Sequence, residues 1–330
     1  MTNLQQIKER IVQGTADEFE EIAMQLFYEQ AEHNAMYKAY LKALNRKIEA
    51  IQGIKEIPFL PIDFFKTHKV QTHLWEAETT FTSSGTTGAT TSRHYVASLA
   101  WYETIFREAF ESFYGAIQDY AVVALLPAYL ERNGSSLVYM AQKMMEESTH
   151  PLSDFYLYDQ EKLVETLQTL EKEEQPTILL GVSFALLDLA EKYTLDLKHT
   201  IVMETGGMKG RRREMVRAEL HAILQKGLGV QHIHSEYGMT ELMSQAYSKG
   251  AGKYACPSWM RVMAREVNDP FSWQKNDKTG ILNIIDLANA DSCAFIATAD
   301  LGRVFDDGTF EVLGRMDHSD ARGCNLMYLG

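Results

Sequence analysis

Residues 177–203 read TILLGVSFALLDLAEKYTLDLKHTIVM. Two short apolar runs, Thr177–Leu180 and Thr200–Met203, have the length and composition of buried strands. Between them, residues 183–193 have the length and amphipathic spacing of a helix. The segment therefore predicts a strand, a covering helix and a second strand.

The same alternation extends from about residue 81 to residue 235. Further strands are predicted at Tyr120–Leu126 and Asp154–Tyr158, and the Val230–His234 run is a strand candidate. Further helices are predicted near 99–114, 135–147, 160–173 and 209–225. Strands that alternate with helices over this length predict an α/β fold with a largely parallel sheet covered by helices on both faces.

The two ends of the chain have other patterns. Residues 4–50 have helical spacing and lead into the proline-punctuated Ile57-Pro58-Phe59-Leu60-Pro61, whereas short strands are predicted after residue 250 at Ile281–Leu287, Cys293–Thr298 and Phe310–Val312. We expect three regions: a helical N-terminal region (1–80), an α/β core (81–250) and a small β-rich C-terminal subdomain (251–330) that ends in a hinge-like tail.

Composition excludes several classes of protein. The 330 residues are 45% hydrophobic and 23% charged, which is typical of a globular protein with a large core. The net charge of −13 disfavours a nucleic-acid partner, although backbone N–H groups still allow a small anion such as a nucleotide to bind.

Targeting and cysteine patterns point to the cell interior. The first ten residues lack the apolar segment of a signal peptide, and no run of 18 apolar residues occurs, so we expect a cytoplasmic protein without a membrane span. Cys256, Cys293 and Cys324 are far apart and form no CxxC pair, which argues against a disulfide framework and a zinc knuckle.

The segment with the clearest chemical signal is Thr82-Ser83-Ser84-Gly85-Thr86-Thr87-Gly88, which follows a possible strand. Glycine tolerates positive φ, and serine and threonine add hydroxyl donors, so such a loop can surround phosphate oxygens with N–H and O–H groups. It lacks the Gly-Lys-Ser/Thr of a Walker A loop. The alternative interpretation is a flexible linker.

A second segment, 235–242, reads SEYGMTEL and follows the Val230–His234 run. Tyr237 is able to stack on a base, Thr240 to reach a phosphate and Glu241 to hold Mg²⁺. The alternative is an ordinary strand-to-helix turn with an acidic first turn.

Two aspartates follow candidate strands near the C-terminus, in Thr298-Ala299-Asp300 and in Leu313-Gly314-Arg315-Met316-Asp317. An aspartate after a strand is able to bind the two hydroxyls of a ribose, although most such residues are turn residues. His232 and His234 face the same side of their candidate strand, but without a third ligand we interpret them as structural.

In this order the segments resemble the adenylate-forming superfamily of acyl-CoA synthetases and related ligases. The resemblance implies that Ser83–Gly88 binds phosphate, that Tyr237 stacks on adenine and that Asp300 binds ribose, and it includes Thr82 and Gly238 among the ATP-binding residues. It further implies an α-phosphate contact for Thr240, magnesium binding for Glu241 and nucleotide binding for Arg315. Gly206 and Gly207 match the backbone that the family lays against adenine, and Ala299 replaces the glycine that usually precedes the ribose-binding aspartate.

A narrower resemblance, to acyl-protein synthetases of the LuxE type, covers nearly the whole chain. The matching stretches are IPFLP (57–61), SRH (92–94), PAYLER (127–132), GSS (134–136), GGMK (206–209), CP (256–257), WMR (259–261) and RGC (322–324). Such enzymes activate a fatty acid with ATP and take the acyl group onto a cysteine near the C-terminus, a position that Cys324 matches.

Ordinary members of the superfamily continue into a further C-terminal domain that supplies a catalytic lysine, whereas this sequence stops at Gly330. We expect Lys209 or Arg93 to supply positive charge in its place. The expected function is ATP-dependent activation of a carboxylic acid, followed by transfer to Cys324 and delivery to a partner such as an acyl reductase. The alternatives are a ligase that passes a smaller carboxylate to CoA or an amine, and a subunit that binds nucleotide or acyl groups without catalysis.

Overall fold

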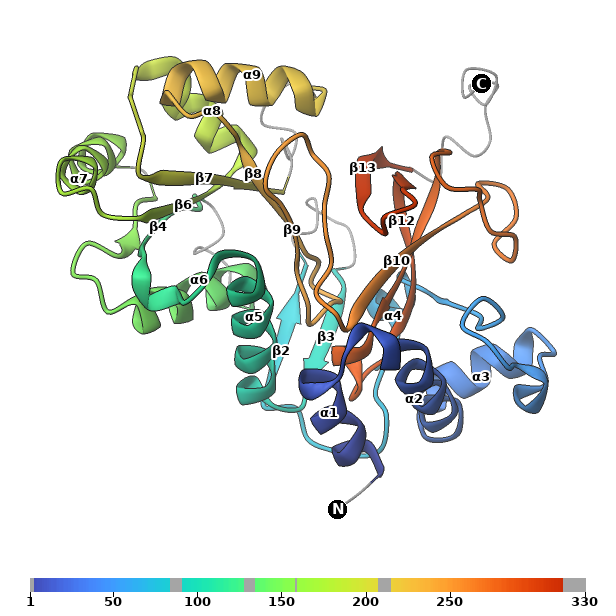
Figure 1. Cartoon of the computed structure of the whole chain (residues 1–330). Helices are drawn as coiled ribbons and strands as arrows, with labels where there is room; N and C mark the ends of the chain where they lie inside the picture. The colour runs from blue at the N-terminus through green and yellow to red at the C-terminus, as the bar shows by residue number, and fades with distance from the viewer. Residues whose placement is uncertain (1–2, 84–90, 128–133, 158, 207–214, 317–330) are drawn as a thin grey trace. The chain divides into compact units, whose positions relative to one another are not determined.

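The computed structural model describes the chain except residues 1–2, 84–90, 128–133, 158, 207–214 and 317–330 (Figure 1). The chain folds into two compact units, each of which is discontinuous in sequence. The mixed-sheet unit comprises Met1–Ile105, Met239–Ser244 and Ala255–Gly330. The parallel-sheet unit comprises Phe106–Gly238 and Gln245–Tyr254.

A six-stranded sheet forms the centre of the parallel-sheet unit. Its strands lie in the order β5-β4-β6-β7-β8-β9 and run parallel except for the antiparallel pair β8 and β9. The strands are β4 (Ala121–Leu125), β5 (Asp154–Phe155), β6 (Thr177–Val182), β7 (Thr200–Thr205), β8 (His234–Tyr237) and β9 (Ala246–Ser248).

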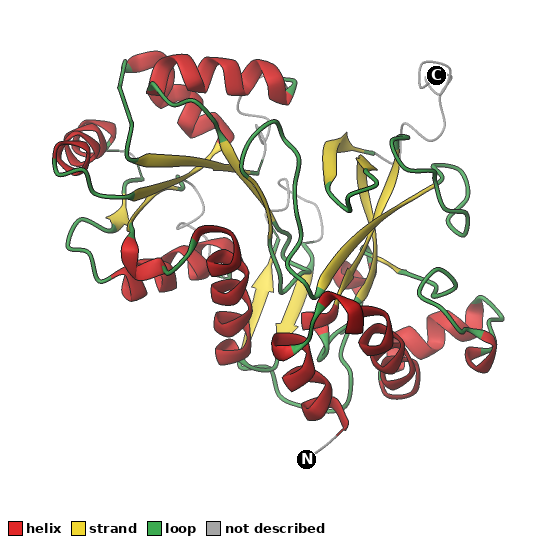
Figure 2. Ribbon diagram, in the orientation of Figure 1, coloured by secondary structure: helices red, strands yellow, loops and turns green. Residues whose placement is uncertain are grey.

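Helices cover both faces of this sheet. They are α5 (Leu99–Tyr114), α6 (Ser136–Ser148), α7 (Gln160–Lys172), α8 (Ser183–Lys192) and α9 (Arg217–Leu228). Helices α8 and α9 lie on one side of the sheet and α6 lies on the other (Figures 1 and 2). Every residue of β4 and β6 is buried, as expected for strands covered on both faces.

Side-chain caps explain where two of these helices begin. The Ser135 hydroxyl accepts a hydrogen bond from the Val138 N–H before α6, and the Asp159 carboxylate accepts one from the Lys162 N–H before α7. Each cap satisfies a backbone donor that has no partner within the first helical turn.

The mixed-sheet unit contains a second sheet and a separate hairpin. The sheet has the order β1-β12-β11-β10, with β13 paired to β12, and the hairpin joins β2 to β3. The strands are β1 (Leu60–Pro61), β2 (Thr79–Thr82), β3 (Arg93–Val96), β10 (Met260–Arg265), β11 (Gly280–Asp286), β12 (Phe295–Val304) and β13 (Phe310–Arg315). Its N-terminal helices are α1 (Asn3–Gln13), α2 (Phe19–His33), α3 (Ala35–Ala43) and α4 (Phe64–Thr67).

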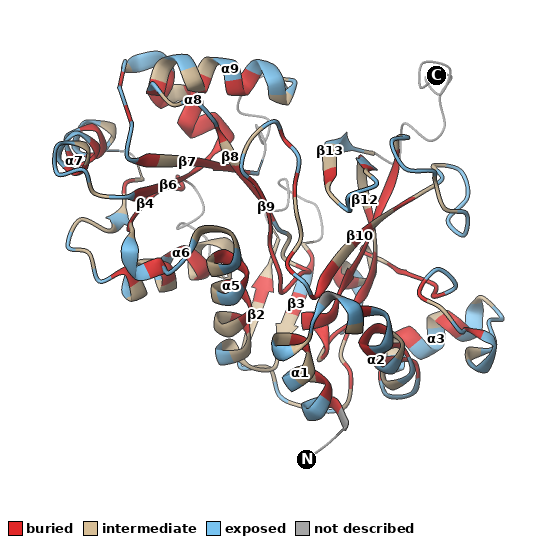
Figure 3. Ribbon diagram, in the orientation of Figure 1, coloured by how far each residue is buried: buried red, intermediate tan, exposed pale blue. Residues whose placement is uncertain are grey.

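An aromatic cluster and a buried amide hold the N-terminal helices on this sheet. The rings of Phe27, Tyr37 and Phe59 surround Phe295 at centroid distances of 6.0, 6.3 and 6.1 Å. Gln30 is fully buried, donates to the carbonyl groups of residues 289 and 290, and accepts from the Ala294 N–H. Figure 3 shows buried residues along the strands of this sheet and along one side of α2.

The structure confirms the α/β class, the helical lead-in and the β-rich C-terminal part. Several boundaries differ from the predicted ones, and three of them lie close to predicted site residues. Strand β8 begins at His234 instead of Val230, so Tyr237 ends a strand instead of lying in a turn. Strand β12 continues past Thr298 to Val304 because it pairs with both β11 and β13. Helix α9 begins at Arg217, and residues 209–214 of the expected helix lie outside the described residues.

None of the helices in the described part of the chain combines the length and the apolar character that a bilayer crossing requires. The three-region division at residues 80 and 250 stays a prediction.

Candidate functional site

The residues expected to bind ATP or magnesium or to act in catalysis are divided between the two units. Seven of them lie in the mixed-sheet unit: Thr82, Ser83, Arg93, Thr240, Glu241, Asp300 and Arg315. Three lie in the parallel-sheet unit: Gly206, Tyr237 and Gly238. The others lie outside the described residues: Ser84, Gly85, Thr86, Thr87, Gly88, Gly207, Lys209 and Cys324.

The expected phosphate loop joins the two strands of the β2–β3 hairpin. Thr82 and Arg93 are cross-strand partners at the end of the hairpin from which the loop departs. One residue further on, the Ser83 N–H donates to the Ser92 carbonyl, and the Ser92 N–H donates to Ser83 Oγ at 2.9 Å. The described ends of the loop are therefore fixed, and the exposed Arg93 side chain starts at one of them.

His94, the residue after Arg93, connects this hairpin to the Thr240 backbone. Its ring is buried, with Nδ1 2.9 Å from the Thr240 carbonyl oxygen and Nε2 3.1 Å from Ser292 Oγ. Burial lowers the pKa of His94 to about 4, so the ring is neutral at physiological pH. A carbonyl only accepts, so Nδ1 carries the proton and Nε2 accepts from the Ser292 hydroxyl.

Glu241 lies in a turn that the Leu242 N–H closes on the Met239 carbonyl. The Asn289 amide donates to the Glu241 carbonyl at 2.9 Å, and the Asp286 carboxylate accepts from the N–H groups of Met243 and Ser244. The segment that carries Thr240 and Glu241 is therefore anchored to residues at the end of β11.

The Glu241 side chain fits a cation ligand. It is 5% exposed, and no lysine or arginine forms an ion pair with it among the residues that the structure describes. Burial raises the pKa of this carboxyl, although a hydrogen bond from Ser92 and the charges of Arg315 and Lys66 act to lower it. A desolvated carboxylate of this kind gains the most from a bound cation.

Asp300 and Arg315 are partners across β12 and β13. Arg315 Nε lies 4.0 Å from Asp300 Oδ1, and the side chains are 61% and 14% exposed. The expectation that Asp300 follows a strand is wrong, because β12 continues beyond it. Asp300 is held by its N–H, which donates to Thr298 Oγ1 at 3.0 Å, while that hydroxyl donates to the Leu282 carbonyl.

In the parallel-sheet unit, polar groups collect where β7 and β8 end. Glu204 and Thr205 of β7 lie opposite Ser235 and Glu236 of β8. This is the edge of a parallel sheet at which α/β proteins bind ligands. The Ser183 hydroxyl lies 2.9 Å from Glu204 Oε2 and 3.0 Å from the carbonyl of Gly206, whose φ of +70° favours glycine.

The two buried acids of this edge carry opposite pKa shifts. Burial raises the pKa of Glu236 to about 7, against the effect of a hydrogen bond that its carboxyl accepts from Thr205. Burial also acts to raise the pKa of Glu204, but His221 and Arg217, with nitrogens 3.5 and 3.7 Å away, lower it overall. Sequence reasoning missed both acids, although Glu204 directly follows the apolar run Thr200–Met203, which is an unusual position for a carboxylate.

Tyr237 and Gly238 continue directly from Glu236. Tyr237 is 9% exposed, and its ring centroid lies 5.8 Å from that of Tyr254. A Cβ atom added at Gly238 would lie 2.5 Å from Glu236 Oε1, so any larger residue at this position would require the buried carboxyl to move.

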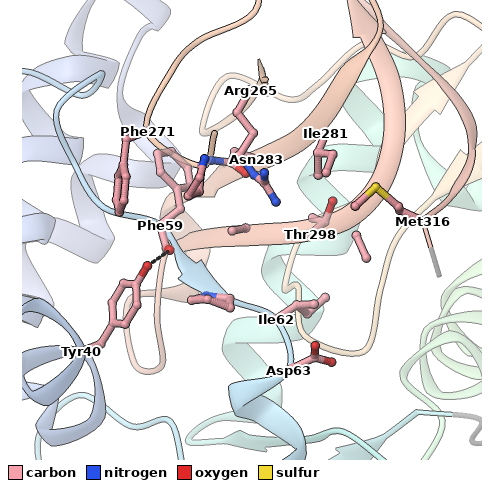
Figure 4. A pocket seen from close by; sticks show the side chains of 14 residues that line it. Tyr40, Phe59, Ile62, Asp63, Arg265, Phe271, Ile281, Asn283, Thr298 and Met316 are labelled. Atoms are coloured by element: carbon pink, nitrogen blue, oxygen red, sulfur yellow. Dashed lines mark hydrogen bonds between the residues drawn. The ribbon is translucent and has the colours of Figure 1, made fainter. Parts of the chain in front are cut away.

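A cavity of about 150 Å³ lies in the mixed-sheet unit, and sequence reasoning did not predict it (Figure 4). Aromatic and aliphatic side chains form much of its wall, including Phe59, Phe271 and Ile281. Arg265 and Asn283 face it together, and in the described ranges Arg265 Nε and Asn283 Oδ1 have no hydrogen-bond partner. Its lining also includes Ala299 and Met316, the chain neighbours of Asp300 and Arg315.

Comparison with known proteins places the fold. No family model and no curated protein sequence matches the chain. Solved structures do match it. ATP-bound MatB from Rhodopseudomonas palustris aligns with a TM-score of 0.54 and 16% identity over 72% of this chain and 47% of MatB. An open conformation of 2-hydroxyisobutyryl-CoA ligase, in complex with 2-HIB-AMP and CoA, aligns with a TM-score of 0.65 and 12% identity.

The second alignment covers 92% of this chain and 71% of the ligase, and the postadenylation state of that enzyme gives a TM-score of 0.63. The chain spans about half the length of MatB. At these identities the likeness shows the fold alone, which this chain shares with 2-hydroxyisobutyryl-CoA ligase.

Proposed function

We propose that this protein is an ATP-dependent ligase that converts a carboxylic acid into an acyl adenylate. The observation that carries the proposal is the group formed within the mixed-sheet unit by Thr240, the buried Glu241 and the β2–β3 hairpin, which His94 holds to the Thr240 backbone. The likeness to solved ligases with bound ATP or acyl-AMP supports it.

In the proposed reaction, a carboxylate oxygen of the acid attacks the α-phosphorus of ATP. The new P–O bond replaces the bond to the β-phosphate, and pyrophosphate leaves. The main obstacle is repulsion between the carboxylate and the phosphates, so catalysis consists of positioning and charge neutralisation.

Different residues of this chain would position the substrates and neutralise their charges. The hydroxyl of Thr240 and the loop 82–88 would hold phosphate oxygens, and Arg93 and Lys209 would offer positive charge. Asp300 would accept hydrogen bonds from the ribose hydroxyls, with Arg315 beside it. Glu241 would hold Mg²⁺, which supplies charge neutralisation at the phosphates when bound. Gly206 and Tyr237 would contact the adenine.

We further propose that the acid is a fatty acid and that the acyl group passes to Cys324. The thiolate would attack the acyl carbon, the bond to AMP would break, and a thioester would remain. The resemblance of the sequence to acyl-protein synthetases supports this step, with an acyl reductase as the partner that consumes the thioester.

A second candidate function shares the adenylation step and differs only in the molecule that accepts the acyl group. The acyl group would pass from the adenylate to CoA instead of to Cys324. This candidate is favoured by the fold likeness to a ligase crystallised with its acyl adenylate and CoA.

ATP–pyrophosphate exchange tests the first half-reaction, with a panel of short, aromatic and long-chain acids and with wild-type protein and the Cys324→Ser variant. We expect ATP–pyrophosphate exchange in both proteins and a covalent acyl label on the wild type alone. Exchange in both proteins, with acyl-CoA formed and no protein label, would replace self-acylation by CoA ligation. ATP binding without exchange for any acid would contradict the ligase and favour a binding subunit.

A further inference from the structure

A cluster of metal-ligating side chains lies away from the candidate nucleotide residues, at the C-terminal end of α2. The ligand atoms of Glu29, His33 and His73 all lie within 4.8 Å of one another. His73 Nε2 lies 2.7 Å from Glu29 Oε1, and His33 Nε2 lies 4.0 Å from the same oxygen. Two imidazoles and a carboxylate thus converge on one point.

The local fold brings these three residues together. Glu29 and His33 are four residues apart on α2, so they share one face of the helix. The helix ends at Asn34, which forms an antiparallel bridge with Thr72, and the His73 N–H donates to the His33 carbonyl at 3.0 Å. The two histidines are therefore joined through their backbones.

Buried hydrogen bonds make this junction rigid. The Asn34 amide and the Thr72 hydroxyl both donate to the Ser292 carbonyl, at 2.7 and 2.6 Å, and the Thr72 N–H donates to the Asp291 carbonyl. Asn34 and Thr72 are both fully buried. The ligands are thus supported by a fixed framework, as an ion site requires.

His73 has a φ of +63°, in the left-handed region that few residues other than glycine adopt. The framework holds it there, and its ring stacks on that of His33 with a centroid distance of 4.4 Å and an interplanar angle of 24°. The Glu29 side chain is 10% exposed, whereas the side chains of His33 and His73 are 47% and 38% exposed. The carboxylate forms the inner wall of the cluster, and the imidazoles leave a path to solvent.

We propose that Glu29, His33 and His73 bind a divalent transition-metal ion, with zinc as the preferred occupant. Imidazole nitrogen with one carboxylate is a donor set that suits Zn²⁺, whereas Mg²⁺ and Ca²⁺ prefer oxygen ligands throughout. Tetrahedral zinc places its ligand atoms about 3.3 Å apart. The distances of 2.7 and 4.0 Å lie on either side of that value, so small side-chain rotations complete the site. Water would supply the fourth ligand.

Calorimetric titration of chelator-treated full-length protein with Zn²⁺ tests the site. The wild type should bind one strong equivalent, and His33→Ala and His73→Ala should each weaken binding by roughly a hundredfold. Glu29→Gln removes the charge of the proposed carboxylate ligand and keeps a side chain of nearly the same shape, so it should also weaken zinc binding. His68→Ala is the matched control, because His68 is an exposed histidine of the same unit that lies outside the cluster, with its Nδ1 2.8 Å from the hydroxyl of Thr67.

Two further readouts separate ligation from a merely structural effect. Co²⁺ in place of Zn²⁺ should give the visible absorption of a four-coordinate ion in the wild type and the His68→Ala variant, and lose it in the others. Zn²⁺ should raise the melting temperature of the wild type and leave that of folded Glu29→Gln unchanged. Equal zinc affinity in the wild type and the His33→Ala/His73→Ala double variant, or no binding to the wild type, would overturn the proposal. The site and its test are independent of the proposed ligase activity.

Discussion

Asp300 and Arg315 lie opposite each other on β12 and β13, with 4.0 Å between Oδ1 and Nε. The arginine is largely exposed, and pairs of this kind contribute at most about 1 kcal/mol to folding. We interpret the pair as a ligand-binding arrangement, because the Asp300 carboxylate is largely shielded from solvent and the Asp300 backbone N–H is held by the Thr298 hydroxyl.

Asp300→Ala should therefore weaken ATP binding with little effect on stability. Loss of charge-assisted hydrogen bonds to the ribose should raise the KM for ATP in the exchange reaction by about 10- to 100-fold. Arg303→Ala is the matched control, since Arg303 pairs with Glu311 across the same two strands at 3.4 Å. Equal KM values in the two variants would contradict ribose binding by Asp300.

Glu241→Gln should abolish the response of exchange to magnesium. The amide preserves the shape of the buried side chain but removes the charge that would hold the ion, so the exchange rate should fall roughly a hundredfold. Urea unfolding should show equal or greater stability, because burial opposes ionisation of this carboxyl. Unchanged magnesium dependence would remove Glu241 from the site.

His94 should make stability depend on pH below neutrality. Its folded pKa of about 4 lies below the usual 6.5, so the unfolded chain takes up the proton first as pH falls. The contribution of His94 to the free energy of unfolding is therefore fully present above pH 6.5. It decreases between pH 6.5 and 4, by up to about 3 kcal/mol in total.

His94→Asn keeps a donor near the Thr240 carbonyl and removes the titration. Its free energy of unfolding, measured by urea titration at several pH values, should therefore fall less steeply than that of the wild type over this range. Parallel curves for the two proteins would show that His94 is not the group responsible.

Glu236 should make the protein less stable as pH rises, which is the opposite of the effect of His94. Its folded pKa of about 7 exceeds the usual 4.5, so its contribution is present below pH 4.5 and is lost as pH rises through 7. Glu236→Gln should be more stable than the wild type at pH 8 by up to about 3 kcal/mol, with the difference vanishing near pH 4.5. Glu165→Gln, an exposed change on α7, should show no such trend in thermal melts across the same pH values.

Arg265→Met should stabilise the mixed-sheet unit. Burial lowers the pKa of Arg265, and its buried Nε has no partner in the described part of the chain, a situation that costs about 1–3 kcal/mol. Arg261→Met, on the same strand, is the control because Arg261 pairs with Glu20 at 2.9 Å and stacks on Phe19. A loss of stability in Arg265→Met greater than that in Arg261→Met would show that the guanidinium is needed for packing.

The strand–helix alternation predicted the parallel sheet because fully buried strands such as β4 and β6 differ sharply in sequence from the amphipathic helices around them. The end of β12 was not predictable, because it depends on pairing with β11 and β13 and not on local composition. Glu241 and Asp300 were identified by motif, and their roles stay predictions. Three other features depend on tertiary contacts between residues far apart in sequence and were not predictable from local patterns. They are the hydrogen bond between His94 and the Thr240 carbonyl, the cavity that Arg265 faces, and the cluster of Glu29, His33 and His73.

The pairing of β1 with β12 determines which unit can complete its contacts first during translation. Leu60 pairs with Ile296, so more than two hundred residues must leave the ribosome before β1 finds its neighbour. Until then Phe27, Tyr37 and Phe59 lack the Phe295 ring around which they pack. The parallel-sheet unit, in contrast, is complete at Tyr254. The N-terminal aromatic residues are therefore without the ring that completes their cluster until nearly nine-tenths of the chain has been made.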